Sequence, residues 1–259
     1  MSVLASTAGE ARQVRQAAPA PGAGAACDLR GRILDALSGV YDPELDEPIT
    51  QLRFVSAVEV GERGAVEVRL RLPTPQCAPN FAFLMGADAR RAVGGVPGVT
   101  RATIRFEDHY TGEEINLALR GGAGFTGAFP GETDDDDLEA LRAIFTRKAL
   151  IGRQATVCER MLAEGWSEEA VLEATVAELP DMPQARRALE LRSQLGLPAG
   201  PASPAFVEPG GERIGACGLR RWLRGAQLVR LSLEANGGIC RDLLRARHGL
   251  AAEGEEDGR

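Results

Sequence analysis

The sequence lacks the marks of several common protein classes. It has no apolar run near the roughly 20 residues that a membrane-spanning helix needs, and no apolar segment of signal-peptide type. Lys148 is the only lysine, and the formal net charge is −7. The sequence therefore contains no cluster of basic residues of the kind that binds the phosphates of a nucleic acid. We expect a cytoplasmic protein that binds neither membranes nor nucleic acids.

Cysteine and histidine are also scarce. The chain has two histidines and five widely spaced cysteines, with no C-x-x-C motif: Cys27, Cys77, Cys158, Cys217 and Cys240. An odd number without paired spacing is typical of reduced thiols rather than of a disulfide framework. A glycine-rich phosphate loop, a serine-centred elbow and a zinc-ligand repeat are all missing from the sequence. We therefore expect a protein that is not an enzyme.

The first half of the sequence predicts an α+β fold. Residues 1–27 are rich in Ala, Gly and Pro, which suits a disordered tail or an organelle transit peptide. Residues 28–120 then read as helix, strand, strand, helix and strand. In "AVEVRLRL" apolar and charged residues alternate strictly, which predicts one buried and one wet face. This order indicates a small α-β-β-α-β sandwich with its helices on one face of the sheet.

The second half predicts only helices. A glycine-rich segment, 121–135, reads as a linker or an ordered lid, and 136–250 as an all-α C-terminal domain before a disordered tail, 251–259. The expected helices cover residues 133–150, 167–179, 183–195 and 218–247, the last interrupted at Asn236-Gly237-Gly238. Ser167 suits an N-cap, and the acidic run at 134–137 fits the positive end of a helix dipole.

Cys77 lies in "LPTPQCAPNFAFLM", where a strand-like run ends and a helix-like run begins. Pro79 suits the first turn of a helix, where its missing N–H costs nothing. The N-terminus of a helix carries about half a positive charge and favours the thiolate form of a cysteine. Cys77 is therefore a candidate nucleophile or metal ligand, and the alternative is a buried thiol that fills the junction.

A second group of polar residues, "FEDHYTGEEIN", follows the third strand. His109 and Glu113 join Cys77 in a candidate metal site if this strand ends beside the cysteine. A thiolate, an imidazole and a carboxylate suit iron or zinc. The alternative is a solvated turn followed by a helix that starts with two glutamates.

The order of several short motifs resembles the iron–sulfur cluster assembly family, which includes the phenylacetate-pathway D protein, the SUF-associated T protein and the cytosolic iron–sulfur carrier subunit. The motifs are D-P-E-L at 42–45, T-x-x-C-x-P at 74–79 and "VPGV" at 96–99. The resemblance covers about residues 28–107. It implies a cluster-transfer motif made of Asp42, Glu44, Thr74 and Cys77.

The resemblance further implies a maturation factor that carries an iron–sulfur cluster or iron transiently. Its partners would be a client metalloprotein, with a monooxygenase as one candidate, and other iron–sulfur assembly proteins; a homodimer is a further expectation. Two alternatives stay open. One is a metal-free adapter or chaperone for a client, and the other is a thiol enzyme with Cys77 as nucleophile and His109 as base.

The remaining cysteines and the arginines near the C-terminus have simpler interpretations. Cys158 lies on an apolar helical face and is expected in the core. Cys217 and Cys240 could complete a cluster site with Cys77, although their spacing does not require it. The basic residues indicate either a docking face for an acidic partner or an ordinary surface helix: Arg220, Arg221, Arg224, Arg230, Arg241, Arg245 and Arg247.

Overall fold

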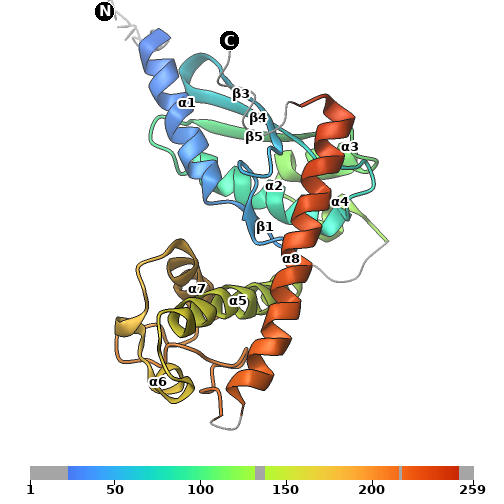
Figure 1. Cartoon of the computed structure of the whole chain (residues 1–259). Helices are drawn as coiled ribbons and strands as arrows, with labels where there is room; N and C mark the ends of the chain where they lie inside the picture. Colours follow the sequence, from blue (N-terminus) through green and yellow to red (C-terminus); the bar gives the residue numbers. More distant parts are fainter. Residues whose placement is uncertain (1–22, 132–137, 216–217, 251–259) are drawn as a thin grey trace, which may run out of the picture.

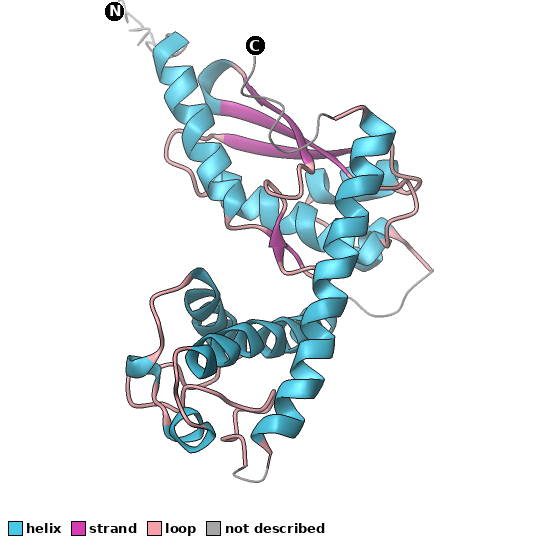
Figure 2. Ribbon diagram, viewed as in Figure 1, coloured by secondary structure: helices cyan, strands magenta, loops and turns pink. Residues whose placement is uncertain are grey.

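The computed structural model describes residues 23–131, 138–215 and 218–250. An α+β part contains the sheet, a second part contains only helices, and the long helix α8 runs along both (Figures 1 and 2). The predicted α+β fold is thus confirmed. The predictions for residues 1–22, 134–137 and 251–259 and for Cys217 fall outside the described residues.

The α+β part follows the predicted order of elements. Its elements are α1 (Ala23–Ser38), β1 (Tyr41–Asp42), β2 (Glu47–Pro48), β3 (Val55–Val60), the 3-10 turn η1 (Glu62–Gly64), β4 (Ala65–Arg71), α2 (Pro79–Gly94), β5 (Arg101–Glu107), α3 (Gly112–Gly121) and α4 (Phe125–Ala128). Helix α1 begins at Ala23 instead of Asp28, so residues 23–27 are helical rather than part of a tail.

The three-stranded sheet has the order β3-β4-β5. Strands β3 and β4 form the predicted antiparallel hairpin, and β5 runs parallel to β4 because α2 crosses over between them. In β4 the side chains of Val66, Val68 and Leu70 are buried, whereas those between them are half-buried. The predicted alternation is confirmed, and it fixes the register of the sheet.

The described part of the glycine-rich segment, up to residue 131, packs against the α+β part. The rings of Phe125 and Phe129 pack within it in a tilted arrangement at a centroid distance of 5.0 Å, and Phe125 also meets Phe83 of α2 edge-on at 5.6 Å. Ala128 and Phe129 are buried in the same core as α1, α2 and the sheet. This part of the predicted linker therefore belongs to the α+β core, because its aromatic side chains bury apolar area that a free linker would leave in water.

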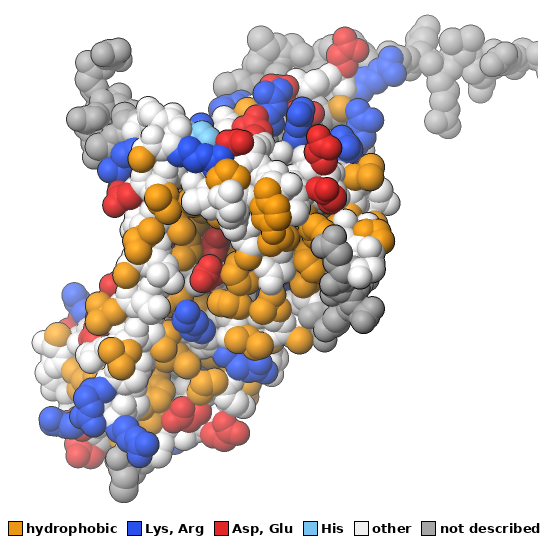
Figure 3. Space-filling view, turned by 90° about the vertical axis from the view of Figure 1, so that its right-hand side faces the viewer, with side chains coloured by type: hydrophobic (Ala, Val, Ile, Leu, Met, Phe, Trp, Pro, Cys, Tyr) orange, Lys and Arg blue, Asp and Glu red, His pale blue; other side chains and the backbone are white. Residues whose placement is uncertain are grey.

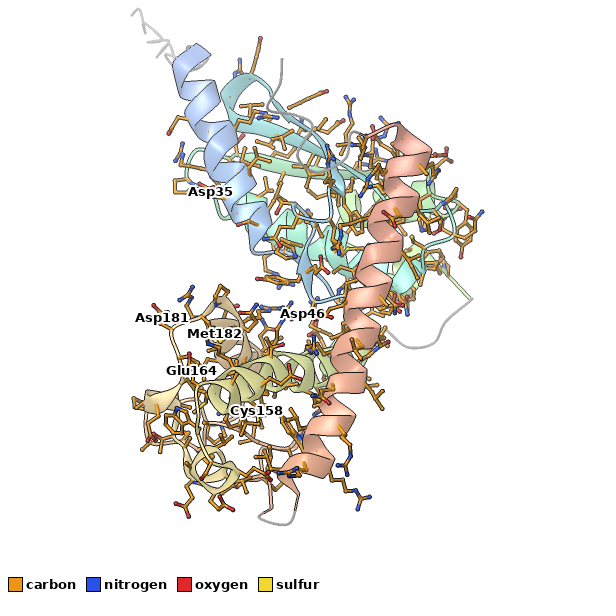
Figure 4. All side chains as sticks on the ribbon, viewed as in Figure 1. Asp35, Asp46, Cys158, Glu164, Asp181 and Met182 are labelled. Carbon is orange, nitrogen blue, oxygen red and sulfur yellow. The ribbon has the colours of Figure 1, made fainter. Side chains whose placement is uncertain are left out.

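The helical part is built from α5 (Leu138–Ala163), α6 (Glu168–Glu173), the 3-10 turn η2 (Val176–Glu178) and α7 (Pro183–Gln194). Cys158 is fully buried in its core, as predicted (Figure 4). Ser167 caps α6 by accepting the N–H of Ala170 at 3.1 Å. The single helix expected over 167–179 is wrong, because the backbone is extended at Ala174 and divides α6 from η2.

Helix α8 (Leu219–His248) is continuous, so the predicted interruption at Asn236-Gly237-Gly238 is wrong. Gly237 is buried, and a Cβ there would lie 2.5 Å from Oε1 of Glu47. The glycine thus allows close approach to β2 rather than ending the helix. Leu244 belongs to the α+β core, so this end of α8 is not part of a separate helical domain.

None of the helices in residues 23–131, 138–215 and 218–250 contains a stretch long and apolar enough to cross a membrane.

Candidate functional site

Cys77 lies where the sequence predicted, two residues before α2 begins at Pro79. Its side chain is half-buried, and its Sγ lies 3.6 Å from Oγ1 of Thr74. The N–H of Cys77 also donates to the carbonyl of Thr74 at 3.4 Å, which closes a turn. No described side chain caps the N-terminus of α2. The backbone N–H groups of its first turn therefore have no side-chain partner, and they point out of the helix end next to Cys77.

His109 lies beside Cys77 but contacts its backbone rather than its thiol. Nε2 of His109 is 2.7 Å from the carbonyl oxygen of Cys77, and Nδ1 accepts the N–H of Thr111 at 3.3 Å. Burial lowers the pKa of His109, so the neutral ring is favoured. Since Nδ1 accepts, Nε2 carries the proton and donates it to the carbonyl. His109 therefore positions the backbone of Cys77.

Glu113 lies apart from the thiol. It is exposed in the first turn of α3, and with His109 it lines a hollow of about 530 Å³ that Cys77 does not line. Among the described residues, no three or more His, Cys, Asp and Glu side chains are grouped to hold a metal ion. The metal set of Cys77, His109 and Glu113 stays a prediction, and the structure does not preform it.

The D-P-E-L motif forms a tight turn between β1 and β2. Oδ1 of Asp42 accepts the N–H groups of Glu44 at 2.8 Å and Leu45 at 3.0 Å. Asp42 is 8% exposed, and burial raises its pKa from 3.8 to about 6, with a further rise from the Glu44 and Glu47 carboxylates. Asp42 thus holds the turn in shape, and its buried carboxylate binds a proton more tightly than usual.

Cys240, on α8, completes this neighbourhood. Burial raises the pKa of its thiol to about 11, and the negative charges of Asp42, Cys77 and Glu44 add to the rise. Cys240 and Cys77 both pack, partly buried, against the core of the α+β part. Of the two cysteines considered with Cys77, Cys240 thus packs against the α+β core, and Cys217 lies outside the described residues.

Arginines of the helical part hold the same turn from the other side. Asp46, 3% exposed, accepts from Nε of Arg153 at 2.7 Å and from Nη2 of Arg187 at 2.6 Å (Figure 4). Arg187 also lies 3.5 Å from the ring centre of Tyr41. Sequence reasoning missed this cluster, because Asp46 follows the motif without belonging to it and its partners come from α5 and α7.

The arginines of α8 do not form a free basic face. Within the described residues, four of them have acidic partners from other parts of the chain: Arg220 with Glu168, Arg230 with Glu159, Arg241 with Glu47 and Arg247 with Asp108. The docking face predicted for an acidic partner is thus largely used within the chain. These pairs fix α8 against both parts.

Comparison with known proteins relates the α+β part of the chain to one protein family. The sequence model of the family described as "Iron-sulfur cluster assembly protein" matches residues 30–104, which span α1 to β5. An uncharacterized protein of Methanocaldococcus jannaschii is 31% identical over 88 residues, which cover 34% of this chain and 90% of that protein. The chain therefore belongs to the iron–sulfur cluster assembly protein family through its α+β part.

Longer relatives match about a third of the chain. An "Iron-sulfur cluster carrier protein" of Mycobacterium tuberculosis is 34% identical over 96 residues, or 36% of this chain. A protein of the same name from Mycobacterium leprae is 29% identical over 82 residues, or 32% of this chain. The chain spans only 25% and 21% of these two relatives.

Proposed function

We propose that this chain carries an iron–sulfur cluster, or the iron for one, to a client metalloprotein. Cys77 is the residue that holds the cargo. The observation that carries the proposal is the half-buried thiol of Cys77 next to the N-terminus of α2, in a domain that belongs to the iron–sulfur cluster assembly protein family. Thiolates are the usual ligands of such clusters, and a helix N-terminus favours the thiolate.

The shape of the site suits transient rather than permanent binding. No complete set of three or more ligands is grouped in the described residues. A cluster held by few protein ligands passes readily to an acceptor that offers a full set. The hydroxyl of Thr74 lies 3.6 Å from Cys77 Sγ, where either group can donate to the other. Asp42 and Glu44 shape the adjoining turn.

The hydrogen bonds of His109 favour a carrier of iron or of a cluster over a thiol enzyme. A thiol enzyme needs a base within reach of its nucleophile. Both ring nitrogens of His109 are engaged, one with the carbonyl of Cys77 and the other with Thr111. The client is a metalloprotein, and the family resemblance indicates a monooxygenase as the candidate to examine first.

Anaerobic reconstitution with ferrous iron and sulfide tests the proposal. We expect the unaltered chain to bind iron and to develop visible absorbance, and Cys77→Ser to lose both. Cys158→Ala is the matched control, because it removes a buried thiol of the helical core and leaves the site intact. Equal iron in Cys77→Ser and the unaltered chain would overturn the assignment of Cys77.

A metal-free adapter is the second candidate, favoured by an exposed apolar row on α8. Leu228, Leu231, Ile239 and Leu243 are all exposed there, and Figure 3 shows hydrophobic side chains gathered on the face that includes α8. In cells lacking the chromosomal copy, rescue by Cys77→Ser but not by Leu231→Glu would favour the adapter. The opposite pattern would favour the carrier.

A further inference from the structure

One face of α8 lies against the α+β part near Cys77. Gly237, Cys240, Leu244 and Arg247 follow each other at intervals of three or four residues, which places them on one side of a helix. Gly237 is buried against Glu47, and Leu244 is 1% exposed in the α+β core. Cys240 lies between these two residues and therefore faces the same way.

Contacts along this face fix the place of Cys240. Gly237 and Arg241, one on each side of Cys240 in the sequence, both approach Glu47, which is the strand partner of Asp42. Further along α8, Arg247 donates at 3.3 Å to the carbonyl of Leu72, the residue that follows β4. Cys240 is held between the D-P-E-L turn and the segment that carries the first thiol.

The chemical surroundings of Cys240 agree with this placement. Cys77 and Cys240 both pack at the edge of the α+β core, and both are free thiols that are only partly buried. Arg247, on the same face of α8, also pairs with Asp108, the neighbour of the His109 whose ring contacts the carbonyl of Cys77. Figure 3 shows acidic side chains in a hollow of this face, surrounded by hydrophobic ones.

We propose that Cys240 is the second thiol of the site, and that Cys77 and Cys240 together bind one iron of the cargo. The identity of the cargo rests on the proposed function, whereas the pairing of the thiols rests on the position of α8. The family match ends at residue 104, so the second ligand comes from a region that the match does not cover.

The binding step involves no change of oxidation state. Each thiol releases its proton to solvent as its sulfur forms a bond to the iron, so two protons leave for each iron bound by the pair. The metal overcomes the high proton affinity of a buried thiol because a thiolate–iron bond replaces the S–H bond. Sulfide of the cluster and groups of the acceptor fill the remaining positions on the iron.

Phenylarsine oxide tests the pairing without any iron. Its arsenic bonds to two neighbouring thiols and releases one water, so one adduct per chain bridges a thiol pair. We expect one bridging adduct by intact mass in the full chain, in Cys158→Ala, in Cys27→Ser and in Cys217→Ser. The adduct should be lost in Cys77→Ser and in Cys240→Ser. An adduct that persists in Cys240→Ser would overturn the pairing.

Reconstitution of Cys240→Ser, with Cys240→Ala as a second variant, tests the role in iron binding. We expect either change to lower the affinity for iron by about tenfold, with the helical content unchanged by circular dichroism. If the unaltered chain and both variants bind iron equally while Cys77→Ser does not, the inference fails and the proposed function stands. If the unaltered chain binds no iron, the proposed function fails, and a bridging arsenic adduct still supports the thiol pair.

Discussion

Nε2 of His109 lies 2.7 Å from the carbonyl oxygen of Cys77, so an imidazole fixes the backbone that carries the proposed cargo thiol. The ring also accepts the N–H of Thr111. It therefore links the end of β5 to the start of α2. His109, which the sequence offered as a metal ligand, thus also holds the backbone of Cys77 in place.

Substitution of His109 distinguishes these two roles. His109→Gln keeps an N–H donor for the carbonyl of Cys77, whereas His109→Ala removes it. We expect His109→Ala to lower the free energy of unfolding by about 1–2 kcal/mol, because the half-buried carbonyl of Cys77 loses its partner. His109→Gln should retain most of the bound iron after reconstitution. Complete loss of iron from His109→Gln, with stability unchanged, would show instead that the imidazole binds the metal.

Asp42 gives the fold a pH dependence that an amide would remove. Its folded pKa, about 6, lies above the ordinary value of 3.8, so the fold favours the protonated form. The stabilisation from this group is complete below about pH 4 and is lost as the pH rises through about 6. Asp42→Asn keeps the acceptor for Glu44 and Leu45. We therefore expect Asp42→Asn to exceed the unaltered chain in stability by about 2–3 kcal/mol above pH 7.

The measurement for Asp42 is the difference in unfolding free energy between the two proteins by urea titration, at several values from pH 4 to pH 8. The difference should be near zero at the acid end and should grow with pH. A difference that stays constant over the whole range would show that Asp42 titrates normally.

Asp46 is expected to hold the two parts of the chain together. Asp46→Asn keeps the size of the side chain but leaves Arg153 and Arg187 facing a neutral group. Loss of one partner from a buried ion pair costs about 3 kcal/mol. Glu190→Gln is the control, because it removes an exposed partner of the same Arg187 and should cost at most about 0.5 kcal/mol. Equal losses in thermal unfolding for the two variants would contradict the account.

Two adjacent glycines of α8 provide a matched pair. A Cβ on Gly238 would meet nothing within 4 Å, so Gly238→Ala should stabilise the helix by about 0.5–1 kcal/mol. A Cβ on Gly237 would displace the Glu47 carboxylate and disturb its pair with Arg241. Gly237→Ala should therefore be about 1 kcal/mol less stable than Gly238→Ala in chemical denaturation. Equal stabilisation by both changes would argue against close packing of α8 on β2.

Much of the α+β part was predictable because its signals are local. The alternation in β4 requires one buried face, and Pro79 just after Cys77 marks the start of α2. The core position of Cys158 follows from its apolar helical neighbours in the same way. These features depend on residues close together in the sequence.

The rest depends on contacts between distant segments. Gly237 and Gly238 resemble a helix break in the sequence. In the structure, Glu47 approaches Gly237 so closely that a side chain at this position would clash with it. The position of Cys240 against the α+β core, and the two arginines on Asp46, follow from the packing of α5, α7 and α8. No local spacing encodes such contacts, so the sequence could offer Cys240 only as one of several candidates.

Delivery of the cargo is the central claim, and transfer to an apo-ferredoxin tests it most directly. The reconstituted chain is mixed anaerobically with the apo-acceptor, and circular dichroism follows formation of the acceptor's cluster with and without an iron chelator. The account predicts transfer that the chelator does not abolish and that Cys77→Ser cannot perform. Transfer that stops when the chelator is present would mean that the chain only releases iron to solution, and would contradict it.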